Sequence, residues 1–204
     1  MKVLIACEFS GVVREAFRRR GHDAWSCDLK PSEDGGQHLQ CDVRDVLDQK
    51  WDFIGAHPEC RYLTVSGMHW TVRGLRDPKL AEDAIAFCEM LWSAIQGTGR
   101  GYLENSIGVL STRSKLGPPH QIIQPWMFGD DASKSTCLWL HGVLPLWYDA
   151  AIAVAPRFVD GKPRWANQTD SGQNRIGPSE NRRTNRARTY AGIANAMAEQ
   201  WGKP

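Results

Sequence analysis

The sequence predicts an α/β fold with a Rossmann-like, open and mostly parallel β-sheet that carries helices on both faces. Short apolar runs rich in branched residues recur along the chain, as expected of strands buried on both faces of a parallel sheet. Segments with helical periodicity alternate with these runs. The first strand, turn, helix and second strand together span about 30 residues, the usual length of a βαβ unit.

The first half of the chain contains the predicted βαβ unit. A strand is predicted over residues 2–7, and a helix follows over residues 12–20. This helix stops at Gly21, which suits the left-handed position after a helix. A second short strand covers residues 22–27, and a third segment covers residues 39–46.

The second half alternates in the same way. The next central strand is predicted over residues 51–56, and a long helix starts at Asp77-Pro78 and runs to Gly97. Two more strands are predicted at 101–103 and 137–140, and a final helix covers residues 189–201.

Composition limits the domain organisation and the function classes. A chain of 204 residues with 42% hydrophobic side chains predicts a single domain over residues 1–204. Periodicity fails between about residues 141 and 188, which we expect to be loop-rich. The net charge of +2 excludes a polybasic coat protein, so any phosphate contact is expected to be local.

Cellular location and metal content are also predicted from the sequence. Apolar runs are too short for a membrane helix and the first residues have no secretory character, which predicts an intracellular, cytoplasmic protein with no membrane partner. The six cysteines include no C-x-x-C pair, so we expect no metal. Most of them are expected to be reduced core thiols.

Candidate functional residues follow the strands, because ligands of open α/β sheets bind outside the carboxyl ends of the strands. A glycine turn that enters a helix can cradle a carboxylate or phosphate, and an acid that closes the second strand can bind a ribose diol. The G-x-G-x-x-G spacing is missing, which disfavours a dinucleotide dehydrogenase. The candidates are Glu8, Phe9, Ser10, Gly11, Asp28, Asp42, His57, Pro58, Glu59, Cys60, Glu104 and Asn105.

Taken in order, these residues resemble the cytosine-5 DNA methyltransferases, most closely the short, phage-type members. The resemblance covers most of the chain. It rests on a glycine turn, a Pro-x-Cys turn, a Glu-Asn pair, a Phe-Gly followed by Lys134, and the start of the last helix: Phe9-Ser10-Gly11, Pro58-Glu59-Cys60, Glu104-Asn105, Phe128-Gly129 and Tyr190-Ala191-Gly192. The chain departs from the family pattern at Val12, Glu59 and Thr136.

The resemblance implies S-adenosylmethionine as cofactor and a class I methyltransferase fold. It places cofactor binding at Glu8, Phe9, Ser10, Gly11, Asp28, Asp42, Pro58 and Gly192. It implies that Cys60 adds to carbon 6 of cytosine as a thiolate, because carbon 5 of the aromatic ring is a poor nucleophile. Glu104, followed by Asn105, would donate a hydrogen bond to ring nitrogen 3 as a protonated acid, and Lys134 would contact the base carbonyl.

Five arginines follow residue 174 with only Glu180 opposing them. Arginine forks suit phosphate, so Arg175, Arg182, Arg183 and Arg186 are the candidates for backbone contact, although a solvated loop has the same composition.

Several alternatives stay open. The substrate is expected to be cytosine in DNA, or else a free deoxycytidine nucleotide, which avoids the cost of extruding a base from a duplex. The departures from the family pattern leave room for a non-catalytic nucleic-acid or cofactor-binding module. An amino-methyltransferase would need an Asp/Asn-Pro-Pro-aromatic turn in place of His57-Pro58-Glu59-Cys60. Cys60 and Glu104 also have plain structural interpretations, as a core thiol and a turn cap.

Overall fold

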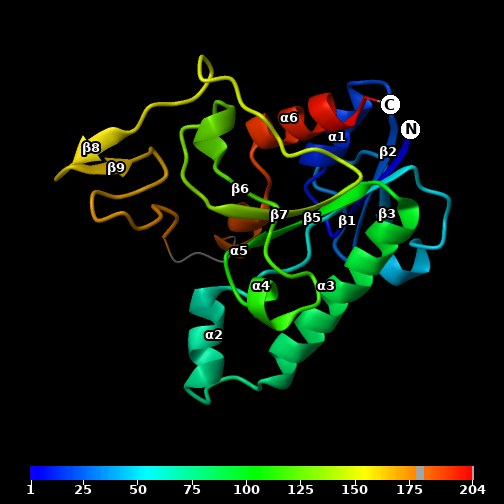
Figure 1. The fold of residues 1–204 in the computed structure, drawn as a ribbon, viewed down its shortest axis with the longest axis horizontal. Helices are drawn as coiled ribbons and strands as arrows, with labels where there is room; N and C mark the ends of the chain where they lie inside the picture. The colour runs from blue at the N-terminus through cyan, green and yellow to red at the C-terminus, as the bar shows by residue number, and fades with distance from the viewer. Residues whose placement is uncertain (178–181, 204) are drawn as a thin grey trace.

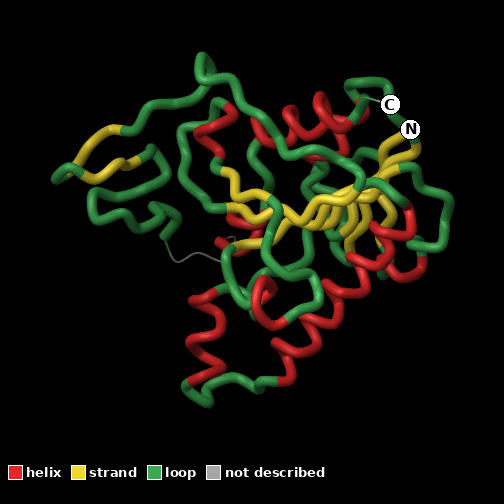
Figure 2. The backbone as a smooth tube through the Cα atoms, viewed as in Figure 1, coloured by secondary structure: helices red, strands yellow, loops and turns green. Residues whose placement is uncertain are grey.

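A computed structural model describes residues 1–177 and 182–203, and within them it shows a seven-stranded mixed sheet between two layers of helices (Figures 1 and 2). The strand order is β3-β2-β1-β4-β5-β7-β6. The strands are β1 (Lys2–Ala6), β2 (Asp23–Asp28), β3 (His38–Gln40), β4 (Phe53–Ala56), β5 (Gly101–Ser106), β6 (Gln121–Ile123) and β7 (Thr136–His141). This confirms the predicted α/β class with an open, mostly parallel sheet.

The sheet topology places a crevice at the carboxyl ends of the central strands. β1 pairs in parallel with both β2 and β4, and β4 pairs in parallel with β5. The direction of strand order reverses between β1 and β4, which is where open α/β sheets bind ligands. β7 departs from the simple doubly wound order because it lies antiparallel between β5 and β6.

Helices cover both faces of the sheet. The helices are α1 (Val12–Arg18), α2 (Val65–Val72), α3 (Lys79–Thr98), α4 (Leu110–Arg113), α5 (Arg182–Ala187) and α6 (Ala191–Trp201), with 3-10 turns η1 (Val43–Asp45) and η2 (Pro125–Phe128). Figure 1 shows α1 and α6 together on one face and α3 on the other. Alternating side chains of the strands feed two cores: Val3 and Ile5 pack toward α1 and α6, whereas Leu4 and Ala6 pack toward α3.

Element boundaries differ from the sequence prediction in places. The long helix passes through Gly97 and ends at Thr98, because Gly99 takes the left-handed conformation that ends it (φ 84°). The third segment divides into the short strand β3 and the turn η1, since Asp42 caps that turn. The elements that sequence analysis did not predict, α2, α4 and β6, are short and carry little periodic signal.

The loop-rich segment over residues 141–188 is mostly irregular where it is described. It contains a hairpin of β8 (Arg157–Val159) and β9 (Lys162–Arg164), and it ends with α5. In Figure 1 the hairpin projects well away from the sheet. Among the described helices, none has the length and apolar character needed to cross a bilayer.

Candidate active site

Two hydrogen bonds join the loop after β4 to the end of β5. The Asn105 side-chain amide donates to the carbonyl oxygen of Pro58 at 3.0 Å. The ring nitrogen Nδ1 of His57 lies 3.3 Å from Oε2 of Glu104. β4 and β5 are parallel neighbours, so their carboxyl ends meet at one edge. The structure therefore brings the Pro-x-Cys turn and the Glu-Asn pair together, as the sequence analysis expected.

Cys60 is half-buried in the turn that leads from this loop toward α2. Its carbonyl oxygen accepts hydrogen bonds from the backbone N–H groups of Leu63 and Thr64, both at 3.0 Å, and these fix the turn. Cys60 does not line either of the two cavities formed by the described residues near the site, although Thr64 does.

The other cysteines include several poor nucleophiles. Burial raises the pKa of Cys27 and of Cys88 to about 12 and that of Cys137 to about 11. Burial, together with the nearby charge of Asp28, also raises the pKa of Cys7. A thiol with a raised pKa holds little thiolate at neutral pH, so these four cysteines fit core packing.

Glu104 is a largely buried carboxylate, with only 17% of its side chain exposed. Burial would raise its pKa, but the hydrogen bond with His57 and the positive charge of Lys134 outweigh burial and lower it. Glu104 is therefore a carboxylate at neutral pH in this structure. This differs from the protonated acid that the resemblance implies at the bound base. His57 is among the candidates from the sequence, but the sequence does not pair it with Glu104.

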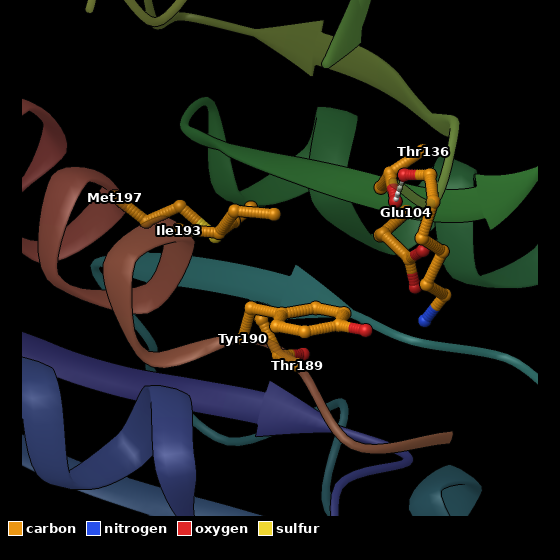
Figure 3. A pocket seen from close by; sticks show the side chains of 7 residues that line it. Glu104, Thr136, Thr189, Tyr190, Ile193 and Met197 are labelled. Carbon is orange, nitrogen blue, oxygen red and sulfur yellow. Dashed lines mark hydrogen bonds between the residues drawn. The ribbon is translucent and has the colours of Figure 1, made fainter. Parts of the chain in front are cut away.

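Glu104 lines a small pocket whose opposite wall comes from the start of α6 (Figure 3). The figure shows Thr189 and Tyr190 facing it, with Thr136 beside it. A wider cavity of about 310 Å³ adjoins this pocket, and both are lined by Lys134 and Tyr190. Its lining is rich in hydroxyl and amide groups: Thr64, Ser106, Ser133, Ser135, Gln168, Asn174 and Asn185. Such groups suit the edge of a base or a sugar.

Lys134 connects this pocket to α5. Its ammonium donates a hydrogen bond to the carbonyl oxygen of Arg186 at 3.1 Å. Arg188 forms a two-pronged ion pair with Glu33, with both N–O distances at 2.9 Å. Residues 186–188 are therefore tied both to Lys134, before β7, and to Glu33, after β2. The structure thus places Lys134 beside Glu104, as expected, and also shows that α5 is held over the site.

The turn after β1 is organised by Glu8, which is only 5% exposed. Its carboxylate accepts hydrogen bonds from the N–H groups of Val13 and Arg14 at 2.7 and 3.2 Å, and from the Ser10 hydroxyl at 3.3 Å. These are N–H groups at the start of α1, which a phosphate would otherwise use. Because a carboxylate already occupies them, this turn favours a cationic ligand over a polyphosphate.

Two residues of this turn have left-handed backbone. Gly11 has φ 73°, and a Cβ there would also overlap the guanidinium of Arg14 and the carboxylate of Asp34. Cys7, at the end of β1, has φ 59°, which is rare for a residue with a side chain. Strain of this kind costs about 1–3 kcal/mol and clusters at functional sites.

The acids at the ends of β2 and β3 are near this turn but differ in availability. Asp28 accepts one hydrogen bond, from the N–H of Lys30 at 2.9 Å. Asp42 is more occupied, because it caps η1 and pairs with the Arg44 guanidinium at 2.8 Å. Leu29, directly after Asp28, is 72% exposed and offers apolar surface at this edge. Asp28 is therefore more available than Asp42 to accept hydrogen bonds from a ribose diol.

Sequence analysis missed the buried cation of this region. Arg14 is fully buried, and its guanidinium pairs with Asp34 and donates to Ser26 Oγ at 3.0 Å and to the Gln37 carbonyl at 3.3 Å. It thereby holds the loop between β2 and β3 against α1. The signal was an arginine within an otherwise apolar stretch of predicted helix.

The remaining candidates have structural contacts of their own. Phe9 lies under the Lys30 ammonium, which is 4.6 Å from the ring centroid. The Gly192 N–H donates to Asp130 at 2.9 Å, and a Cβ at Gly192 would overlap the Phe128 carbonyl, so this glycine serves close packing of α6 on η2.

The arginine candidates are exposed where they are described. Arg175 donates to the Gln168 carbonyl at 2.9 Å, and Arg186 lines the wider cavity. The side chains of Arg182 and Arg183 lie outside what the structure describes, as do residues 178–181 with Glu180.

The chain matches no protein-family model and shows no significant similarity to a curated protein.

Proposed function

We propose that this protein is an S-adenosylmethionine-dependent methyltransferase that methylates carbon 5 of cytosine in DNA through a covalent adduct with Cys60. The observation that carries this proposal is the pair of hydrogen bonds between the loop after β4 and the end of β5. They hold the loop that leads to Cys60 against the end of β5, which carries Glu104, and the proposed activation of a pyrimidine ring needs a thiolate and a carboxyl group together. The open, mostly parallel sheet that we expected for this class supports the proposal.

The residues at the ends of β1 and β2 fit the cofactor. S-adenosylmethionine carries an ammonium and a sulfonium, which suit the carboxylate of Glu8, and a ribose diol, which suits Asp28. The exposed side chain of Leu29 offers an apolar surface for the adenine. When bound there, the cofactor supplies the methyl group.

The chain's own residues activate the base. The Cys60 thiolate forms a bond to carbon 6, and the electron pair of the ring double bond moves toward ring nitrogen 3 through carbon 5 and the amidine system. As nitrogen 3 gains this electron pair it takes up a proton, which comes from solvent through the Glu104 carboxyl group. The Glu104 carboxylate then accepts a hydrogen bond from this N–H, and takes the proton back when the aromatic ring is restored. Lys134, which lines the same pocket, donates to the base carbonyl. The Cys60–carbon 6 bond breaks when carbon 5 loses its proton, which restores the aromatic ring.

DNA is the proposed source of the cytosine because of the surface next to the site. Arg175 and Arg186 are exposed near the wider cavity, and neither pairs with an acid among the described residues. Guanidinium groups in such a position suit backbone phosphates. A free nucleotide has a phosphate as well, so the experiment must separate the two substrates.

Covalent capture with DNA that contains 5-fluorocytosine tests the mechanism. Fluorine at carbon 5 cannot leave as a proton does, so the adduct with the wild-type protein and S-adenosylmethionine is expected to persist in denaturing gels. Cys60→Ser is expected to lose the adduct and to lower methyl transfer at least about 10⁴-fold. Cys41→Ser, which changes another half-buried thiol, is the matched control and is expected to keep the adduct.

Labelled cofactor tests the substrate. Duplex DNA, single-stranded DNA, RNA and deoxycytidine nucleotides are incubated with methyl-labelled cofactor, and the labelled base is identified by mass spectrometry. Label on carbon 5 of DNA cytosine supports the proposal. Label on mononucleotides alone rejects DNA as the substrate, and label on the exocyclic amine or no transfer rejects the mechanism.

A further inference from the structure

His57 lies directly after β4, and its ring bridges two residues of β5. Nε2 lies 2.7 Å from the hydroxyl of Tyr102, and Nδ1 lies 3.3 Å from Oε2 of Glu104. The ring meets that of Tyr102 edge-on, with centroids 5.4 Å apart. Only 7% of the His57 side chain is exposed. A buried, doubly hydrogen-bonded histidine has a defined orientation, and here it is aimed at the carboxylate of the site.

The backbone of β4 makes this contact possible. Gly55 stands opposite Tyr102 in the parallel register, and a Cβ at Gly55 would overlap the Tyr102 ring. The absence of a side chain therefore lets the phenol lie across β4 and reach the histidine two residues further on.

The position of the protons follows from the tyrosine. Tyr102 is fully buried, and burial together with the charges of Glu8 and Glu104 raises its pKa well above the ordinary value. The phenol therefore stays protonated, and its O–H donates a hydrogen bond to Nε2 of His57. Nε2 is then an acceptor, so the ring proton of neutral His57 is on Nδ1 and points at Glu104.

We propose that His57, with its tautomer fixed by Tyr102, is a positioning residue that holds Oε2 of Glu104 and leaves Oε1 to face the pyrimidine ring. This inference rests on the proposed function of the site. Within the described residues, the side chain of Glu104 has no hydrogen-bond partner besides His57. A sequence motif gives no sign of this role, because the histidine acts through the acid and touches no substrate.

The charged and titratable groups around His57 come from four parts of the fold. Glu8 faces it from the turn after β1, and Tyr102 and Glu104 face it from β5. Lys134, in the loop before β7, lowers the pKa of Glu104, and the charge of Glu104 together with burial raises the pKa of Cys137 on β7. The ionisation of Glu104 depends on His57 and Lys134, since both oppose the effect of burial.

Two substitutions of His57 test its hydrogen bonds with Glu104 and with Tyr102 separately. In His57→Asn the side-chain amide can replace the Nδ1–H donor, so the contact with Glu104 is kept and that with Tyr102 is lost. In His57→Gln the longer amide reaches the Tyr102 hydroxyl, so the contact with Glu104 is lost. Tyr102→Phe removes the group that fixes the tautomer. Circular dichroism and thermal unfolding identify variants that do not fold.

Titration of Glu104 gives a readout that needs no activity. The protein is labelled with ¹³C at the glutamate carboxyl carbons, and the Glu104 resonance is assigned by its loss in Glu104→Gln. We expect the Glu104 midpoint to stay near the wild-type value in His57→Asn and to move to higher pH in His57→Gln, because burial is then less opposed. Tyr102→Phe is expected to lie between them. Equal midpoints in wild type, His57→Gln and Tyr102→Phe overturn the proposal.

Kinetics separate positioning from a purely structural role. For His57→Gln we expect kcat/KM on DNA to fall about tenfold at neutral pH, the size of one hydrogen bond to a charged group. The defect should shrink as the pH rises, because the remaining Glu104 becomes ionised, and His57→Asn should restore most of the rate. Equal, pH-independent losses in both variants contradict the inference. Wild-type protein that forms no 5-fluorocytosine adduct contradicts the proposed function instead, while the carboxyl titration still tests the role of His57.

Discussion

Two edges of the same sheet use charge in opposite ways. At the β1–β3 edge, formed by residues 7–14, 28–37 and 41–45, acidic side chains bind the chain's own donors: Glu8 caps α1 and Asp34 pairs with buried Arg14. At the β5–β7 edge, formed by residues 104–106, 133–136, 164–177 and 185–190, Lys134 and Arg175 donate to backbone carbonyl oxygens. The first edge is compensated internally, whereas the second keeps an excess of positive charge.

This difference indicates which ligand each edge suits. A carbonyl oxygen satisfies a hydrogen bond of a cation but does not cancel its charge, so Lys134 and Arg175 still attract an anion. At the β1–β3 edge, Glu8 and Asp34 are occupied, and Asp28, which accepts a backbone N–H, is the acid that can also accept hydrogen bonds from hydroxyl groups. The proposed cofactor, with its ribose diol, and the proposed polyanionic substrate therefore fit the two edges.

The largest expected effect concerns the internal compensation at the β1–β3 edge. Asp34→Asn removes one of the two carboxylates that pair with the fully buried Arg14, and leaves Glu15 at 3.1 Å as the other. Ser26 and the Gln37 carbonyl also still bind the guanidinium. Because the Asp34 side chain is 36% exposed, we expect a loss of about 1–3 kcal/mol in the free energy of unfolding, less than for a fully buried pair. Urea unfolding at neutral pH measures it.

The pH dependence of this loss sharpens the test. Burial would raise the pKa of Asp34, but hydrogen bonds from Arg14, Ser32 and the Gly36 N–H lower it from 3.8 to about 2. A carboxyl group whose pKa is lower in the folded state than in the unfolded state stabilises the fold at pH values above its unfolded-state pKa. This stabilisation is lost as the pH falls to the folded-state pKa. Wild type and variant should therefore converge between pH 3.8 and about 2. Asp83→Asn, in an exposed pair with Lys79, is the control and should cost less than about 0.5 kcal/mol. Equal losses in the two variants contradict the compensated network.

The β1–β3 edge was the more predictable from sequence. Apolar runs located β1, β2 and β4, and the parallel topology then fixed which residues follow them at one edge. The position of Asp28 follows from this reasoning. The use of Glu8 as a helix cap does not, since its partners are backbone N–H groups that no side-chain pattern reveals.

The β5–β7 edge was predicted less completely. Lys134 was placed beside Glu104 by resemblance to a family, and the pocket confirms that they are neighbours. The contact of Lys134 with α5 depends on how a long irregular segment returns to the sheet, which periodicity cannot predict. The hydrogen bond with His57 and the charge of Lys134 lower the pKa of Glu104, and these contacts are found only in three dimensions. The protonated acid that the resemblance implies at the bound base stays a prediction.

A smaller effect is expected when Asp28, the acid proposed to bind the ribose, is changed. Asp28→Asn keeps the size and the hydrogen bond to the Lys30 N–H but removes the charge, so we expect the Kd for S-adenosylmethionine to rise about tenfold. Titration calorimetry measures this. Asp48→Asn, at an exposed position, is the control. Unchanged affinity in Asp28→Asn would remove the cofactor from the β1–β3 edge and with it the chemical contrast between the edges.

The smallest effect is expected from a single exposed arginine at the β5–β7 edge. Arg186→Gln removes one charge while its carbonyl oxygen, the acceptor for Lys134, stays in place. If Arg186 contacts a phosphate, the slope of log K against log salt should decrease by about 0.9. The affinity advantage of the wild-type protein for duplex DNA then shrinks by about threefold between 50 and 200 mM salt. Fluorescence anisotropy at several salt concentrations measures the slope.

Arg19→Gln gives the matched control for this measurement. Arg19 is equally exposed but follows α1, where it bonds to Asn195 on α6, away from the carboxyl edge of the sheet. Its loss lowers the net charge by the same amount, so it reports the effect of overall charge alone. A salt slope that changes equally in both variants means that the excess positive charge at the β5–β7 edge is not a phosphate contact, and that DNA approaches the site from another side.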